Sequence, residues 1–249
     1  MKQIFTFLTF LLLFTACKTN DFTANLPNNQ AGKVIEKAIN AHGGQRYETA
    51  SYQFVFRDKT YTFKNNGVDY EYTLQYTKEG KQIFDKMNND GFTRTINGNP
   101  ARLTEKQISS YSNGLNSVIY FATLPHKLTD AAVNLKYAGT EIVKGKTYDR
   151  INVFFNEEGG GKDYDDQFIY WINQTTNTVD YLAYNYQVNG GGVRFREAYN
   201  SRRINGILFQ DYGNYKAEVG TPLTDLAALF AKGELKKLSV IATEEVKAL

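Results

Sequence analysis

Aromatic residues recur at every second position in several segments of this chain. The chain has 18 Tyr and 17 Phe among 249 residues, and mostly polar residues separate them in these segments. Side chains with a period of two lie on one face of a β-strand, and antiparallel sheets commonly bury one such face. The alternating residues are Tyr52, Phe54 and Phe56, and then Tyr70, Tyr72, Leu74 and Tyr76.

Turn-forming dipeptides separate these segments and indicate consecutive hairpins. Asn66-Gly67, Asp90-Gly91 and Asn97-Gly98 have the composition of tight turns between antiparallel strands. From Gly139 onward the alternation resumes. Further strands are predicted within residues 151–155, 168–172, 182–188, 193–195 and 238–241.

Two longer segments show helical spacing instead. Residues 34–42 place their apolar side chains on one helix face, and Gly43 follows as a stop. Thr104 and Gln107 match a capping box, and the apolar stripe after them predicts a helical insertion that ends before Pro125.

A last helix is predicted after Thr221, with Pro222 at its first position and Gly233 beyond its end. Helices and an antiparallel meander in this order predict an α+β fold. Its centre is a single large curved antiparallel sheet.

The N-terminal segment indicates a lipid anchor. Lys2 precedes the apolar run 4–14, and the small residues Thr15-Ala16 precede Cys17, the one cysteine of the chain. This arrangement resembles a bacterial lipobox, which implies that Cys17 becomes lipidated and attaches the protein to a membrane. The predicted division is a signal peptide over 1–16, a lipidated flexible tether over 17–30 and one domain over 31–249.

Composition excludes several other classes. The net charge is +3 with both signs interspersed, which argues against nucleic acid as a partner. A single cysteine allows no disulfide within the chain. The sequence lacks the His and Cys spacings of zinc sites, and we predict no metal and no cofactor.

Carboxylates leave an enzymatic alternative open. Acidic residues beside the glycines 159–161 offer oxygen ligands for calcium, but their spacing is not that of an EF-hand. Two carboxylates are sufficient for glycoside hydrolysis. The candidates, among which the sequence chooses no pair, are Asp163, Asp165, Asp166, Glu197 and Asp211.

Two arginines follow the second glycine triplet, residues 190–192. On a strand, Arg194 and Arg196 point to one face, while Val193 and Phe195 point to the other. Neighbouring arginines bind a carboxylate or phosphate group well. Pairing with acidic residues of adjacent strands remains the alternative.

The chain also resembles a known family. Ala41-His42-Gly43-Gly44 at the end of the first helix, followed by curling strands, is similar to the lipoprotein carriers LolA and LolB. A denser set of residues resembles uncharacterised Gram-negative envelope lipoproteins: Tyr170-Trp171-Ile172-Asn173, Asp180-Tyr181-Leu182-Ala183-Tyr184, Gly190-Gly191-Gly192, Arg194-Phe195-Arg196-Glu197-Ala198-Tyr199-Asn200 and Asn205-Gly206.

This resemblance implies a half-barrel with a helical lid, whose concave aromatic face holds acyl chains. It also implies an outer-membrane location, since Lys18 follows the cysteine where inner-membrane lipoproteins carry aspartate. The membrane face to which the protein is exposed stays open.

The leading hypothesis is an outer-membrane lipoprotein that binds an apolar or lipidic ligand, without established catalysis. Its alternatives are a carbohydrate-active enzyme and a non-catalytic partner-binding module. The predicted ligand-binding residues are Tyr52, Phe54, Phe56, Tyr70, Tyr72, Tyr76, Tyr111, Leu115, Arg194 and Arg196.

Overall fold

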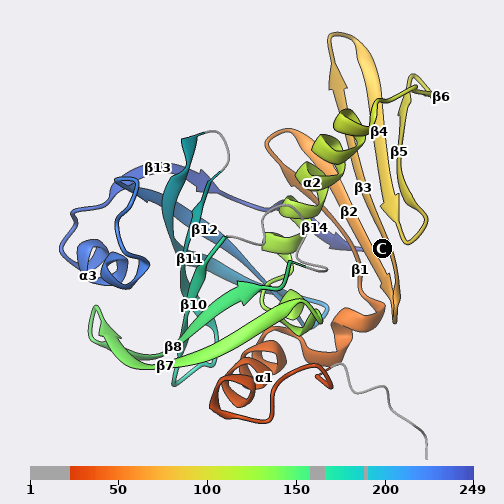
Figure 1. Ribbon diagram of the computed structural model, residues 1–249. Helices are drawn as coiled ribbons and strands as arrows, with labels where there is room; N and C mark the ends of the chain where they lie inside the picture. The colour runs from red at the N-terminus through yellow and green to blue at the C-terminus, as the bar shows by residue number, and fades with distance from the viewer. Residues whose placement is uncertain (1–22, 158–165, 188–189) are drawn as a thin grey trace, which may run out of the picture.

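The computed structural model describes residues 23–157, 166–187 and 190–249 (Figure 1). The predicted signal peptide, Cys17 and the first part of the predicted tether lie outside these ranges. The glycines 159–161, Asp163 and Asp165 also lie outside them.

The fold is α+β with antiparallel strands, as predicted, and the strands form two sheets of seven strands each. The first sheet comes from the N-terminal half of the chain, and the last strand completes its edge beside β1. Its strands, in order across the sheet, are β14 (Glu244–Ala248), β1 (Ser51–Phe56), β2 (Lys59–Asn66), β3 (Asp69–Lys78), β4 (Lys81–Asn88), β5 (Gly91–Ile96) and β6 (Asn99–Pro100).

The second sheet is a meander of the C-terminal half. Each strand pairs with its neighbour in sequence, so the order across the sheet is the order along the chain in reverse. Its strands are β13 (Lys236–Ile241), β12 (Ile207–Ala217), β11 (Gly192–Ile204), β10 (Val179–Tyr186), β9 (Phe168–Asn173), β8 (Lys146–Phe155) and β7 (Val133–Val143).

The two sheets are connected where the chain passes from β13 to β14, at Thr243. The backbone N–H of Thr243 donates to Oδ1 of Asp211 at 2.9 Å, and Nη1 of Arg202 donates to the same oxygen at 3.1 Å. Asp211 is 4% exposed, so these bonds satisfy a buried carboxylate. In place of one continuous curved sheet, the described residues therefore form two separate sheets, which the C-terminal strands join.

The two longer helices have the predicted terminal signals. Helix α1 (Gln30–His42) ends at Gly43, whose φ of 149° suits glycine, but it begins earlier than predicted because Asn29 caps it. Thr104 and Gln107 form the predicted capping box of α2 (Glu105–Ala122). Short 3₁₀ turns, η1 (Gly44–Thr49) and η2 (His126–Thr129), follow the two helices.

The last predicted helix is a 3₁₀ turn, η5 (Leu223–Asp225), followed by the short helix α3 (Leu226–Ala231). The prediction of Pro222 at the first helical position is wrong, because Pro222 precedes the first turn. The Thr221 hydroxyl caps no helical N–H and donates instead to the Glu218 carbonyl. The predicted apolar stripe is nevertheless buried, and its residues are Leu223, Leu226, Ala227 and Phe230.

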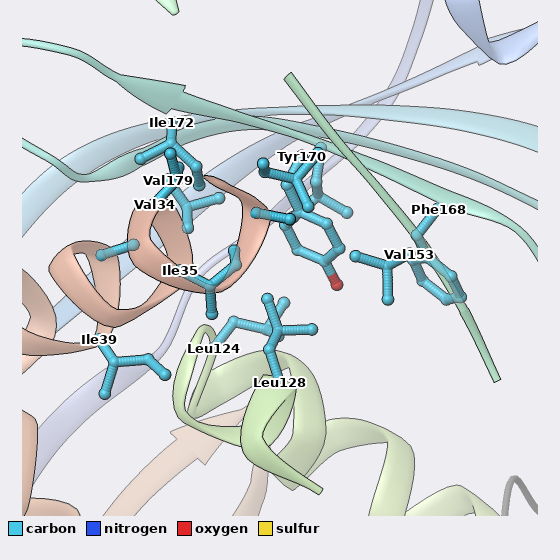
Figure 2. Close-up of a cluster of buried hydrophobic side chains, with 14 of the residues drawn as sticks. Val34, Ile35, Ile39, Leu124, Leu128, Val153, Phe168, Tyr170, Ile172 and Val179 are labelled. Atoms are coloured by element: carbon cyan, nitrogen blue, oxygen red, sulfur yellow. The ribbon is translucent and has the colours of Figure 1, made fainter. Parts of the chain in front are cut away.

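The buried apolar side chains of the described residues form three clusters. The first packs α1 against one face of the second sheet, and Figure 2 shows Val34, Ile35 and Ile39 of α1 beside Leu124 and Leu128. The second lies between the first sheet and α2, and the third lies between α3 and the other face of the second sheet. Strand β9 is buried at every position, because its sheet is covered on both faces.

Candidate functional site

A hollow of about 270 Å³ lies at the seam between the first two apolar clusters. It receives side chains from both sheets and from the C-terminal half of α2, which crosses in front of the first sheet (Figure 1). Its lining residues are Phe54, Phe56, Arg57, Ser117, Val118, Phe121, Ala122, Tyr184, Arg196, Gln210, Tyr212, Asn214, Ile241 and Thr243.

Arg196 is the charged group inside this hollow. The residue is 7% exposed, and its guanidinium carbon lies 3.8 Å from the centre of the Phe121 ring. Its Nη2 donates to the hydroxyl of Tyr184 at 2.9 Å, while its buried Nε has no hydrogen-bond partner among the described residues. Arg196 forms no ion pair with a carboxylate in that part of the chain.

The pairing of β11 explains the position of Arg196. Leu182 on β10 and Asn214 on β12 lie directly opposite it, so Arg196 shares their face of the sheet. Val193 and Phe195 point to the α3 side, as the alternation predicts. Arg194 lies on the same face of the sheet as Arg196. Its guanidinium donates hydrogen bonds to the Tyr186 hydroxyl and to the backbone carbonyl of Val193.

Two lining residues of the hollow also carry buried polar atoms that have no hydrogen-bond partner within the described ranges. Gln210 Oε1 and Asn214 Oδ1 are buried without a hydrogen bond among the described residues. Burial raises the pKa of Tyr212 to about 12, so its hydroxyl stays protonated at neutral pH. Unpaired donors and acceptors are rare inside native proteins, and their concentration here indicates a place for a polar group.

The hollow therefore combines two kinds of surface. Phenylalanine, valine and isoleucine side chains form apolar walls, and the charged residues in its lining, among the described parts of the chain, are Arg57 and Arg196. Arg57 and Ser117 are exposed and lie at the rim. Such a site suits an amphiphilic molecule with an apolar body and an anionic or polar end.

The structure places the predicted ligand-binding residues in two groups. Phe54, Phe56 and Arg196 line the hollow together. The other aromatic residues of the first sheet pack in its cluster with α2: Tyr52 and Tyr72 are buried, and Tyr70 and Tyr76 are partly buried. Leu115 is 1% exposed in the same cluster.

Tyr111 and Arg194 lie outside this hollow. The Tyr111 ring lies under Arg94, with the guanidinium carbon 3.5 Å from the ring centre. Arg94 in turn makes two hydrogen bonds to Asp85, at 2.5 and 2.7 Å. Tyr111 therefore attaches the N-terminal half of α2 to β4 and β5.

Several lining residues were not among the predicted ones. Phe121 lies within the predicted helical insertion, although it was not one of the predicted stripe residues, and Tyr184 belongs to a predicted alternating strand. Gln210, Tyr212 and Asn214 lie on β12, a strand that the sequence did not predict.

Three carboxylates of the enzyme hypothesis, Asp166, Glu197 and Asp211, lie within the described residues, and none of them lines the hollow. Asp211 accepts the hydrogen bonds of Thr243 and Arg202 described above. Glu197 accepts a hydrogen bond from the Tyr215 hydroxyl at 3.2 Å and lies 3.7 Å from the ammonium group of Lys144. Within the described residues, no three His, Cys, Asp or Glu side chains gather as a metal site.

A larger hollow of about 800 Å³ lies at one end of the second sheet. Asn152, Gln167, Asn185 and Gln187 give it a more polar lining, and Gln187 directly adjoins a part of the chain outside the described ranges. It brings together none of the predicted ligand-binding residues.

Both histidines belong to the interior rather than to either hollow. His42 is fully buried, and its Nε2 accepts the backbone N–H of Val179 at 3.1 Å. The His126 ring stacks on Tyr47 with 4.7 Å between centres. Burial lowers the pKa of His42 to about 3 and that of His126 to about 4, so both are neutral at pH 7.

The fold of this chain was compared with those of solved structures. The crystal structure of a LolA superfamily protein from Nitrosomonas europaea aligns with a TM-score of 0.50 and 11% identity, over 87% of this chain and 92% of that one. A DUF1329 family protein from Desulfovibrio piger aligns with a TM-score of 0.47 and 10% identity, over 88% of this chain and 92% of that one. The protein has a LolA-like fold.

The chain belongs to a family of unknown function, DUF6503, whose model matches residues 2–246. No curated protein matches it. Among the described residues, no helix is both long enough and apolar enough to cross a bilayer.

Proposed function

We propose that this protein is a lipid-anchored outer-membrane protein that binds a lipidic ligand in the hollow between α2 and the two sheets. The apolar chain of the ligand packs against Phe54, Phe56 and Phe121. Its anionic end lies beside Arg196. The observation that carries the proposal is a buried arginine that faces an apolar hollow without a carboxylate partner among the described residues.

The cost of burial supports an anion as the partner of Arg196. Removing a charge from water costs several kcal/mol after relaxation, and the rings of Phe121 and Tyr184 return only part of this. A carboxylate or phosphate on the ligand would form charge-assisted hydrogen bonds with the guanidinium of Arg196. The ligand would thereby complete the charge balance of the hollow.

The volume of the hollow limits the apolar part. Sites for small organic ligands begin at roughly 300 Å³, and about 270 Å³ is available here. The hollow accordingly suits one alkyl chain better than the two chains of a whole phospholipid. Each methylene that the ligand buries there would contribute about 0.8 kcal/mol to binding.

The LolA-like fold agrees with this proposal, since resemblance to LolA and LolB predicts acyl chains on the concave face. The lipobox-like segment supports the anchor, which we assign to Cys17. Replacing Cys17 with Ala tests it: the wild type should fractionate with outer membranes and the variant should not. A variant that remains in the membrane fraction would exclude this anchor.

Native mass spectrometry of the purified chain tests the ligand. The wild type should carry one co-purified single-chain amphiphile, or take up one molecule of dodecanoate after delipidation. A chain that shows only its own mass and takes up no dodecanoate would contradict the proposal.

A further inference from the structure

Three cationic side chains form a row across the second sheet beside the hollow. Arg194 on β11 lies directly opposite Lys216 on β12, and Lys216 lies directly opposite Lys236 on β13. Residues opposite one another in antiparallel strands project from the same face, with Cβ atoms about 5 Å apart. The three residues are called the cationic row below.

The cationic row lies on the face of the sheet that lines the hollow. Arg196 and Asn214 line the hollow. Arg194 is two residues from Arg196 along β11, and Lys216 is two residues from Asn214 along β12. Two residues along a strand correspond to about 7 Å, so the row begins at about that distance from Arg196. Arg and Lys side chains are long enough to reach across this interval.

No carboxylate of the described residues pairs with the cationic row. Lys144, Arg150 and Arg202 each have an acidic partner in the second half of the chain, but Arg194, Lys216 and Lys236 have none within ion-pair distance there. Like charges directly opposite one another destabilise a sheet. Lys216 and Lys236 are also exposed and accessible to a ligand.

We infer that the cationic row binds a second anionic group on the ligand of the hollow. The ligand class is then an alkyl chain with a diphosphate or a comparable polyanionic head group. This inference rests on the proposed function and specifies the head group of the ligand. The first anion binds Arg196, and the second lies toward Arg194, Lys216 and Lys236, where arginine and lysine supply several phosphate-binding donors.

Calorimetric titration of the purified chain with dodecyl phosphate and with dodecyl diphosphate tests the inference, because the two probes differ by one phosphate. The wild type should bind the diphosphate at least about tenfold more tightly. The double variant Lys216→Gln/Lys236→Gln should lose this preference and keep its affinity for dodecyl phosphate.

A matched control removes two positive charges away from this face. Lys237 lies opposite Tyr215, 6.0 Å from the centre of that ring on the other face, and Lys232 follows α3. Lys232→Gln/Lys237→Gln should retain the preference for the diphosphate, because the cationic row is intact. Equal loss in both double variants would show a general charge effect and overturn the inference.

The remaining outcomes separate the two proposals. Equal affinity of the wild type for both probes overturns the cationic row and leaves the hollow as a binding site. Absence of binding by either probe overturns the proposed function and the inference with it. Inorganic diphosphate that binds as tightly as dodecyl diphosphate would show an anion site independent of the alkyl chain, which also overturns the inference.

Discussion

The guanidinium of Arg196 lies over the ring of Phe121, with 3.8 Å between the guanidinium carbon and the ring centre. One residue belongs to β11 of the second sheet and the other to α2, which covers the first sheet. This contact closes one side of the hollow and places a cation against its apolar wall. Binding of an amphiphile is therefore expected to depend on this pair.

Replacing Arg196 with Met should weaken binding of dodecanoate by roughly 10- to 100-fold, since a hydrogen bond to a charged group contributes about 1.5–3 kcal/mol. The free energy of unfolding should stay the same or rise, because Met fills similar space without a buried charge. Calorimetry and urea unfolding measure the two effects. Arg196→Lys should bind with intermediate affinity, and unchanged affinity in Arg196→Met would exclude Arg196 as the anion site.

Replacing Val118 with Trp should fill the hollow and reduce dodecanoate affinity by at least about tenfold. Val118 lines the hollow, whereas Asn116 is exposed on the same helix and does not line it. Asn116→Trp is thus the matched control and should bind like the wild type. Equal binding by both variants would place the ligand elsewhere.

Replacing Asp85 with Asn should destabilise the protein by about 3–5 kcal/mol, because Arg94 would keep a buried charge without its partner. The side chains of Asp85 and Arg94 are 1% and 9% exposed, and two hydrogen bonds join them. The double variant Asp85→Leu/Arg94→Met should recover much of this loss. Urea unfolding at pH 7 provides the comparison, and a neutral effect of Asp85→Asn would contradict it.

Stability should fall as the pH decreases from 6.5 to 4.5. The pKa of His42 is about 3 in the folded state against 6.5 for an ordinary histidine, so the unfolded chain binds a proton that the folded chain excludes. The loss from His42 amounts to about 1.4 kcal/mol per pH unit. His42→Gln keeps an acceptor for Val179 and cannot titrate, so its loss between pH 6.5 and 4.5 should be about 2 kcal/mol smaller, because the unfolded histidine is already half protonated at pH 6.5. An equal loss of stability in both proteins would contradict this prediction, because His42 would then bind a proton as readily in the folded protein as in the unfolded chain.

Local signals in the sequence predicted the elements that depend on neighbouring residues. Gly43 and the pair Thr104 and Gln107 end and begin helices through contacts within one turn, so α1 and α2 were readable. Strand β2 was missed because the turn before it, Arg57-Asp58, adopts positive φ without glycine. Strand β12 was missed because its C-terminal half is mostly polar and contains Gly213.

The candidate site could be predicted only in part, for a related reason. Alternation placed Phe54 and Phe56 on one face and Arg194 with Arg196 on another, and these faces are as predicted. Periodicity does not show what covers a face: Tyr52 packs against Phe209 of β12, and Tyr72 lies in the cluster that includes residues of α2. Phe54 and Arg196 line the same hollow because of how the two sheets join at Thr243. This arrangement depends on residues far apart in the sequence, which local patterns do not predict.

A crystal structure of the protein with bound 12-bromododecanoic acid would show where the ligand lies, because anomalous scattering locates the bromine. We expect the carboxylate at Arg196 and a bromine peak among Phe54, Val118 and Phe121. A peak in the larger hollow beside Thr221 and Leu223, or no ordered bromine at saturating ligand, would contradict this expectation.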